Sequence, residues 1–136
     1  MKNSDNPYFM ERIIAAATYA TMGMVGFVWL IIVALTKSNL RSFLKYHIFQ
    51  SFFLVMAFFI ISKLMGLVVS ILGVIPFLNM LVFKLLFLFD SPLIFGFSII
   101  NFCVLTVMLY LVLTSLQGKY SYIPWISNII DANVRR

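Results

Sequence analysis

The chain has 136 residues, of which 63% are hydrophobic and only 10% are charged. Soluble domains carry roughly 45–50% apolar and about 25% charged residues, so this chain has too few charges to cover a water-facing surface. The composition therefore predicts an integral membrane protein. The net charge of +6 comes from scattered basic residues, which suit lipid headgroups, so no nucleic-acid partner is expected.

The apolar runs predict helices rather than a transmembrane barrel, because they lack the alternation with polar residues that a barrel requires. Backbone groups in lipid must form hydrogen bonds within their own segment. We expect an all-α integral membrane protein, a compact bundle of four transmembrane helices forming a single domain over residues 1–136. The polar first dozen residues precede a long apolar run without a cleavage site, which indicates a permanent span and not a signal peptide.

The first span is predicted over residues 13–35. Its small residues Ala16, Ala20 and Gly23 fall on one stripe of a helix, which either favours close contact with another helix or is a chance run. The second span is predicted over residues 46–73, within a longer helical tract. Lys45 and Lys63 would lie about 27 Å apart along this helix, so each can reach a different headgroup layer.

The third segment, residues 74–89, is short and carries Lys84. It is predicted as a short or tilted span, with a re-entrant or interfacial helix as the alternative. The fourth span is predicted over residues 93–116, with Pro92 in its first turn. Four spans place both termini on one side, and the bias of lysine and arginine favours the cytoplasm or its organellar equivalent.

The C-terminal tail shows helical periodicity over residues 124–134. Apolar residues recur on one side, beginning with Trp125, and polar residues occupy the other. A short amphipathic helix with a tryptophan is typical of a segment that lies in the headgroup plane. We therefore expect an interfacial helix here.

A group of polar residues stands at the start of the second span, and on a helix they share one face: Tyr46, His47, Gln50 and Ser51. The opposite face carries Arg41 and Lys45, followed by Ile48 and Phe52. Since polar groups that face lipid without partners cost several kcal/mol, the polar face is predicted to turn toward other helices.

Two interpretations of this polar face remain open. It either bonds neighbouring helices together or lines a polar vestibule. Asn101 is a further candidate for the polar interior, whereas Arg41, Lys45, Lys63 and Trp125 are the predicted contacts with lipid headgroups. The single histidine, the lone Cys103 and four acidic residues form no catalytic or metal-binding pattern. We therefore expect no enzyme activity and no cofactor.

Three blocks of sequence resemble a known family. They are Glu-Arg-Ile-Ile at residues 11–14, Phe-Leu-Lys-Tyr-His-Ile-Phe-Gln-Ser at residues 43–51, and Gly-Lys-Tyr followed by Ile-Pro and Ile-Ser within residues 118–127. Their order and their positions against four hydrophobic segments are similar to those of the twenty-kilodalton subunit family of the chloroplast inner-envelope translocon (the Tic complex) and its bacterial homologues.

This resemblance implies a four-helix membrane protein with both termini in the stroma or cytoplasm. It further implies a subunit of a protein-conducting or solute-conducting membrane complex, whose partners are the bilayer, other membrane proteins and a translocated polypeptide. The alternative is a non-conducting assembly subunit. The chain departs from the plastid members in lacking a transit peptide, which favours a bacterial cytoplasmic membrane, for instance a cyanobacterial one, with the plastid inner envelope as the other location.

Overall fold

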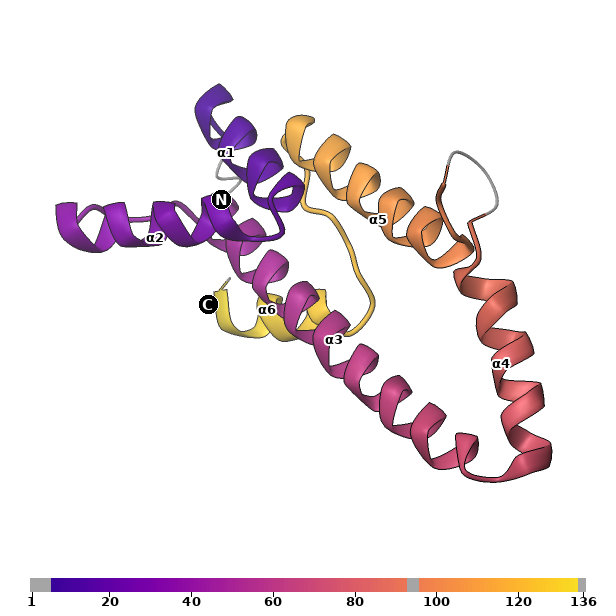
Figure 1. Cartoon of the computed structure of the whole chain (residues 1–136). Helices are drawn as coiled ribbons and strands as arrows, with labels where there is room; N and C mark the ends of the chain where they lie inside the picture. The colour runs from indigo at the N-terminus through magenta and orange to yellow at the C-terminus, as the bar shows by residue number, and fades with distance from the viewer. Residues whose placement is uncertain (1–5, 93–95, 135–136) are drawn as a thin grey trace. The chain divides into compact units, whose positions relative to one another are not determined.

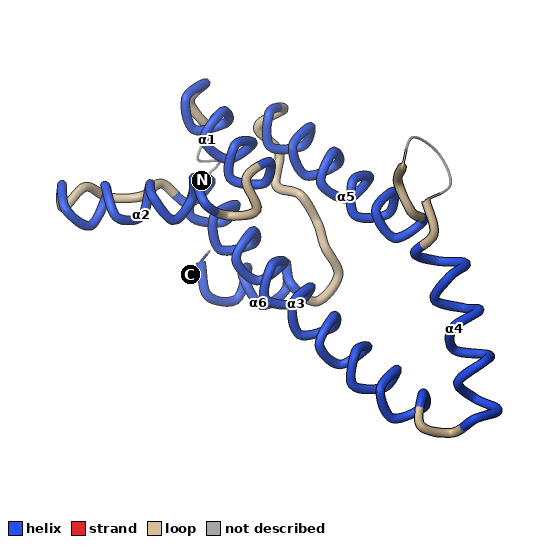
Figure 2. Tube along the Cα trace, in the orientation of Figure 1, coloured by secondary structure: helices blue, strands red, loops and turns tan. Residues whose placement is uncertain are grey.

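The computed structural model describes residues 6–92 and 96–134, and these residues form an all-α protein (Figures 1 and 2). The helices are α1 (Phe9–Ala20), α2 (Met24–Thr36), α3 (Ser42–Gly73), α4 (Pro76–Asp90), α5 (Ile99–Leu116) and α6 (Ile126–Val134). The expected helical class is thus confirmed for the described residues.

The chain packs as two compact units. The terminal unit comprises Met1–Met56 and Met108–Arg136, so it contains α1, α2, the beginning of α3, the end of α5 and α6. The central unit, Ala57–Val107, contains the rest of α3, all of α4 and the beginning of α5. Buried side chains are concentrated in the terminal unit.

The first predicted span, residues 13–35, is not one continuous helix but is divided between α1 and α2. The chain turns between α1 and α2, where Met22 has a φ of 51° and Gly23 a φ of 92°. The N–H of Gly23 donates to the Thr18 carbonyl at 2.7 Å, and the N–H of Met22 donates to the Tyr19 carbonyl at 3.0 Å. Glycine, which lacks a Cβ, adopts such a left-handed φ at little cost, so Gly23 ends the helix instead of extending a small-residue stripe.

The next two helices begin and end close to the predicted positions. Helix α3 has 32 residues and is therefore about 48 Å long, and α4 begins at Pro76 as a first-turn proline favours. Helix α5 starts later than predicted. The expected residues 93–95 lie outside the described residues, Gly96 has a φ of 79°, and the Ser98 hydroxyl accepts the N–H of Asn101 at 3.3 Å, which caps a helix that begins at Ile99.

Within the described ranges, two helices, α3 and α5, are long and apolar enough to cross a membrane. None of the residues in the most apolar stretch of α3 is buried within the protein. A core helix of a soluble protein would be mostly buried, so this exposure favours a lipid environment for α3. Helix α2 is apolar but has only 13 residues, about 20 Å of helix.

The apolar core of the terminal unit lies where α1, α2 and α3 meet. Ala15 of α1 packs with Phe43, Leu44 and Ile48 of α3. Ile48 was predicted on the face opposite the polar residues, with Arg41 and Lys45, but it is fully buried. The reason is that α1 and α2 cover that side of α3 as well.

Gly26 allows a close approach between these helices. A Cβ at this position would lie 2.6 Å from Thr18 Cγ2 and 3.3 Å from Ile48 Cγ1. This close contact is made by a glycine outside the predicted stripe. Within the stripe, Gly23 lies against Ser51, Ala16 is buried and Ala20 is exposed.

The predicted tail helix is present as α6, although it begins at Ile126 and not at Pro124. Trp125 precedes it with a φ of 72°. Ser127 and Ile130 are buried against the terminal unit, whereas Trp125 is 83% exposed and Ile129 is 48% exposed. The apolar stripe is thus divided between the protein interior and the outside.

Candidate functional site

A buried cluster of polar side chains occupies the centre of the terminal unit. Its members are each no more than 3% exposed: Tyr19, Tyr46, His47, Gln50, Ser121 and Ser127. They come from α1, from the first turns of α3, from the segment that leads into α6, and from the start of α6 itself. We call this set the polar core.

Gln50 lies at the centre of the polar core. Its Nε2 donates to the Ser121 carbonyl at 3.1 Å and to the Ser127 hydroxyl at 3.2 Å. Its Oε1 accepts from the Tyr19 hydroxyl at 2.7 Å and from the Ser121 hydroxyl at 2.7 Å. Both ends of the amide are therefore used in joining α1 and α3 to the C-terminal segment.

The Ser121 carbonyl determines which groups of Gln50, Tyr19 and His47 donate hydrogen bonds and which accept them. A carbonyl only accepts, so the Gln50 amide nitrogen must face it and the amide oxygen must face Tyr19. The single proton of the Tyr19 hydroxyl is then given to Gln50. It follows that His47 Nδ1, 2.8 Å from the Tyr19 oxygen, carries a proton and donates it to Tyr19.

His47 is enclosed by aromatic rings. Its ring lies against Phe43, with a centroid separation of 4.4 Å, and stacks nearly parallel to Tyr120 at 6.1 Å. Tyr19 and Tyr46 meet it edge-on at 5.6 and 5.5 Å. The other ring nitrogen, Nε2, is buried without a hydrogen-bond partner among the described residues, with the Lys119 backbone near the ring.

The C-terminal segment is held in place by further bonds. The Tyr46 hydroxyl donates to the Ser121 carbonyl at 2.9 Å, so this carbonyl receives bonds from two residues of α3. The Ser127 hydroxyl accepts the N–H of Ile123 at 2.8 Å. Since buried polar groups without partners are costly, this mutual satisfaction fixes residues 121–127 against α3.

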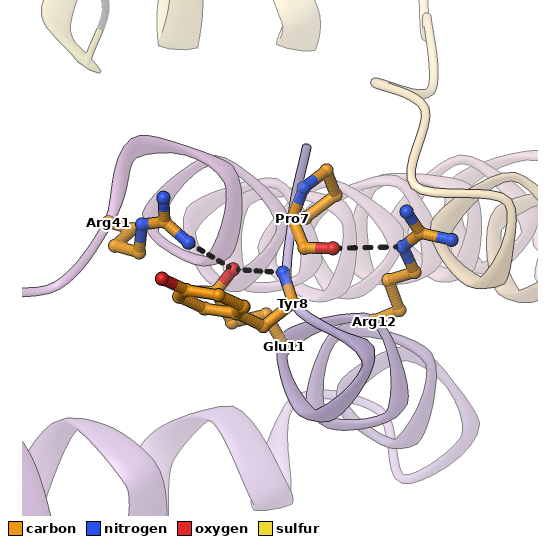
Figure 3. A network of polar contacts seen from close by, with 5 residues as sticks. All are labelled: Pro7, Tyr8, Glu11, Arg12 and Arg41. Carbon is orange, nitrogen blue, oxygen red and sulfur yellow. Dashed lines mark hydrogen bonds and ion pairs between the residues drawn. The ribbon is translucent and has the colours of Figure 1, made fainter. Parts of the chain in front are cut away.

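A second, more exposed network lies at the start of α1 (Figure 3). The Glu11 carboxylate accepts the N–H of Tyr8 at 2.9 Å, which caps the helix, and pairs with Arg41 at 3.4 Å. The Arg41 guanidinium lies 4.3 Å from the centre of the Tyr8 ring. Arg12 points away from this pair, and its Nε donates to the Pro7 carbonyl at 3.2 Å.

The structure places the predicted polar residues as follows. Tyr46, His47 and Gln50 belong to the polar core. Ser51 is also buried and lies against Gly23, since a Cβ added to Gly23 would be 3.1 Å from the Ser51 hydroxyl oxygen. Asn101 is exposed and belongs to the central unit.

The predicted headgroup contacts differ among themselves. Trp125 and Lys63 are exposed, and Lys63 Nζ lies 5.4 Å from the centre of the Phe59 ring. Lys45 is partly buried. Arg41 pairs with Glu11 inside the chain, which leaves less of its charge for a phosphate.

Sequence reasoning missed Tyr19, Ser121 and Ser127 as members of the polar core. The signal for Ser127 was its place next to Ile130 on a helix, where a small polar residue interrupts the apolar stripe. Nothing in the sequence paired Tyr19 or Ser121 with Gln50. Among the described residues, no three His, Cys, Asp or Glu side chains gather as a metal site would need.

Comparisons with protein-family profiles, with curated proteins and with solved structures find no match to this chain. The polar core therefore has to be interpreted from its own geometry. Apart from His47 Nε2, the side chains of the polar core are hydrogen-bonded within the chain, which suits a structural role.

Proposed function

We propose that this protein is an integral membrane protein that works as a subunit of a larger membrane complex. The central unit supports this, because its apolar side chains face outward around each helix. Phe58, Ile61 and Leu67 of α3 and Phe77 and Phe87 of α4 are each more than half exposed. Exposed apolar surface on this scale marks contact with lipid or with another protein.

We further propose a translocon-type complex, and the observation that carries this proposal is the convergence of the three resemblance blocks. Arg12, from the first block, contacts Gly118 in the third. Gln50, from the second, bonds Ser127 in the third, and Tyr46 and Gln50 both bond Ser121, which lies between the parts of the third block. Segments far apart in the sequence thus build one site, as expected if they act together in one function.

In this proposal the polar core holds the subunit together and does not line the conducting path. The hydrogen-bonding groups of Gln50 and the Tyr46 hydroxyl are taken by the chain's own C-terminal segment. Of the two interpretations of the polar face, the geometry thus favours bonding between segments. A path for a polypeptide or solute is then formed with other subunits, against the exposed helices.

The alternative, a non-conducting assembly subunit, is favoured by the same exposed helices of the central unit. Purification in mild detergent, with identification of co-purifying proteins, tests both. A translocon subunit should co-purify with membrane proteins and with a substrate polypeptide arrested in transit. Recovery of membrane partners without any arrested polypeptide would support the assembly role, and recovery of no partner would contradict both.

The polar core offers a matched test within the chain. Gln50→Leu should weaken the folding of the terminal unit and, through it, the complex seen on native gels. Asn101→Leu, which changes an exposed amide in the central unit, should leave the complex assembled. Loss of transport in Gln50→Leu with a fully stable subunit and complex would instead place Gln50 on the path.

A further inference from the structure

Two arginines lie near the start of α1 in different electrostatic settings (Figure 3). Arg41 is paired with the Glu11 carboxylate at 3.4 Å and lies over the Tyr8 ring. Its charge is therefore compensated within the chain.

Arg12 has no such compensation from the described residues. Its Nε donates to the Pro7 carbonyl, a neutral group, and within residues 6–92 and 96–134 it pairs with no carboxylate. The side chain is partly buried, so its orientation is restricted. The two terminal nitrogens of the guanidinium make no hydrogen bond to the described part of the chain.

Gly118 provides the space in which this guanidinium lies. A Cβ at position 118 would lie 2.8 Å from Arg12 Nε and 3.0 Å from Arg12 Cζ, and Gly118 has a φ of 73°. Any other residue there would strain the backbone and displace the arginine. The next residue, Lys119, is exposed and adds a second positive charge at the same turn.

We propose that Arg12, together with Lys119, binds the phosphate of an anionic phospholipid. A guanidinium held at Nε presents its remaining N–H groups in a planar fork that matches phosphate oxygens. Arg12 directly precedes the apolar run that begins at Ile13, which places it at headgroup depth. The proposal rests on the membrane location proposed above, since the bilayer supplies the phosphate.

The test is a titration of the detergent-solubilised full chain with phosphatidylglycerol or phosphatidylcholine, followed by native mass spectrometry. Arg12→Gln should weaken phosphatidylglycerol binding about five-fold, which corresponds to about 1 kcal/mol. Lys119→Gln should weaken it less, because an exposed lysine is not oriented. The matched control Arg41→Gln should weaken phosphatidylglycerol binding less than Arg12→Gln does, because the Arg41 charge is already paired with Glu11.

Several outcomes would overturn the proposal. Equal weakening by Arg12→Gln and Arg41→Gln would mean that only net charge attracts the lipid. Equal binding of phosphatidylcholine would remove the preference for an anionic headgroup. Displacement of the lipid by millimolar inorganic phosphate at constant ionic strength would assign the site to free phosphate.

Two further measurements keep the result interpretable. Arg12→Lys retains the charge without the planar fork and should show intermediate lipid binding; if Arg12→Gln fails to fold, full binding by Arg12→Lys contradicts a guanidinium-specific site. Solubility of the protein in detergent-free buffer would contradict the membrane location itself. That result is independent of the lipid preference, so failure of the two proposals can be told apart.

Discussion

Gln50 makes four hydrogen bonds to three residues from two other segments, so at the residue scale it connects α1 and α3 with the C-terminal segment. An amide in a buried site is tolerated only when both of its ends are satisfied. The polar core meets this condition. The C-terminal segment supplies the two acceptors for the Gln50 amide nitrogen, and the Ser121 and Tyr19 hydroxyls donate to its amide oxygen. The hydrogen bonds to the C-terminal segment therefore account for the position of Gln50 without an aqueous path.

We expect Gln50→Leu to lower the free energy of unfolding by roughly 1–3 kcal/mol, because the Tyr19 and Ser121 hydroxyls lose their partner. Unfolding in mixed detergent, followed by circular dichroism, measures this change. Asn101→Leu is the control, since an exposed substitution should alter stability by no more than about 0.5 kcal/mol. Equal effects of the two substitutions would contradict the central role of Gln50.

Gly26 gives a second prediction at this scale. Gly26→Ala should destabilise the protein by about 1–3 kcal/mol, as overpacking does, because the new Cβ would lie 2.6 Å from Thr18 Cγ2. Thr18→Ala removes that methyl group, so the double variant should recover part of the loss in the same unfolding measurement.

Gly66→Ala is the matched control for Gly26→Ala. Gly66 lies in α3, and a Cβ added there would have no neighbouring atom within 4 Å. Alanine is favoured over glycine in a helix by about 0.5–1 kcal/mol, so this substitution should be neutral or stabilising. A similar loss for Gly26→Ala and Gly66→Ala would mean that close packing does not explain Gly26.

At the element scale, α6 has two sides with different roles. Ser127 and Ile130 attach it to the terminal unit, and Trp125 and Ile129 remain exposed. An amphipathic helix that keeps a tryptophan outside is typical of the membrane interface. The attachment by Ser127 and Ile130 explains how so short a helix stays folded, since isolated helices shorter than about 12–15 residues are marginal in water.

We therefore expect Trp125 to lie at the headgroup level. In vesicles, its fluorescence should be quenched more by bromine near the headgroups than by bromine at the ends of the acyl chains. Trp125→Phe leaves Trp29 as the only tryptophan, so the difference between the two proteins reports Trp125 alone. Absence of quenching at either depth would show that the tail does not touch the membrane.

The break between α1 and α2 matters at the scale of the whole molecule. The two helices have 12 and 13 residues, or about 18 and 20 Å of helix, and each is shorter than the roughly 30 Å hydrocarbon core. A crossing by this region therefore needs both helices in series. The N–H groups at the turn are satisfied by bonds to α1, which makes a turn inside the bilayer acceptable.

We predict that the two termini lie on the same side of the membrane and that Asn39 lies on the other. Single cysteines introduced at Ser4, Asn39 and Asn133, in a Cys103→Ser background, can be labelled from outside intact cells to measure this. Labelling of Asn39 together with Ser4 would show that α1 and α2 do not cross. Labelling of Ser4 and Asn133 on opposite sides would show an odd number of crossings.

The sequence by itself was sufficient to predict the helical class and the approximate extent of α3, α4 and α6. These follow from apolar content and from local signals such as Pro76, which act within a few residues. It could not predict the turn at Gly23, because a single glycine within an apolar run is compatible with a continuous helix. The start of α5 was also missed, since Pro92 and Ser98 are both acceptable first residues by local rules.

For the polar core, the sequence indicated only that Tyr46, His47, Gln50 and Ser51 share one helix face. Which segment covers that face depends on the tertiary structure, because a hydrogen bond between Gln50 and Ser121 joins residues 71 positions apart. The same holds for the contrast between Arg41 and Arg12, since only the folded chain brings Glu11 to one guanidinium and Gly118 to the other. Local patterning determines helices, whereas contacts between distant segments determine which polar groups satisfy one another.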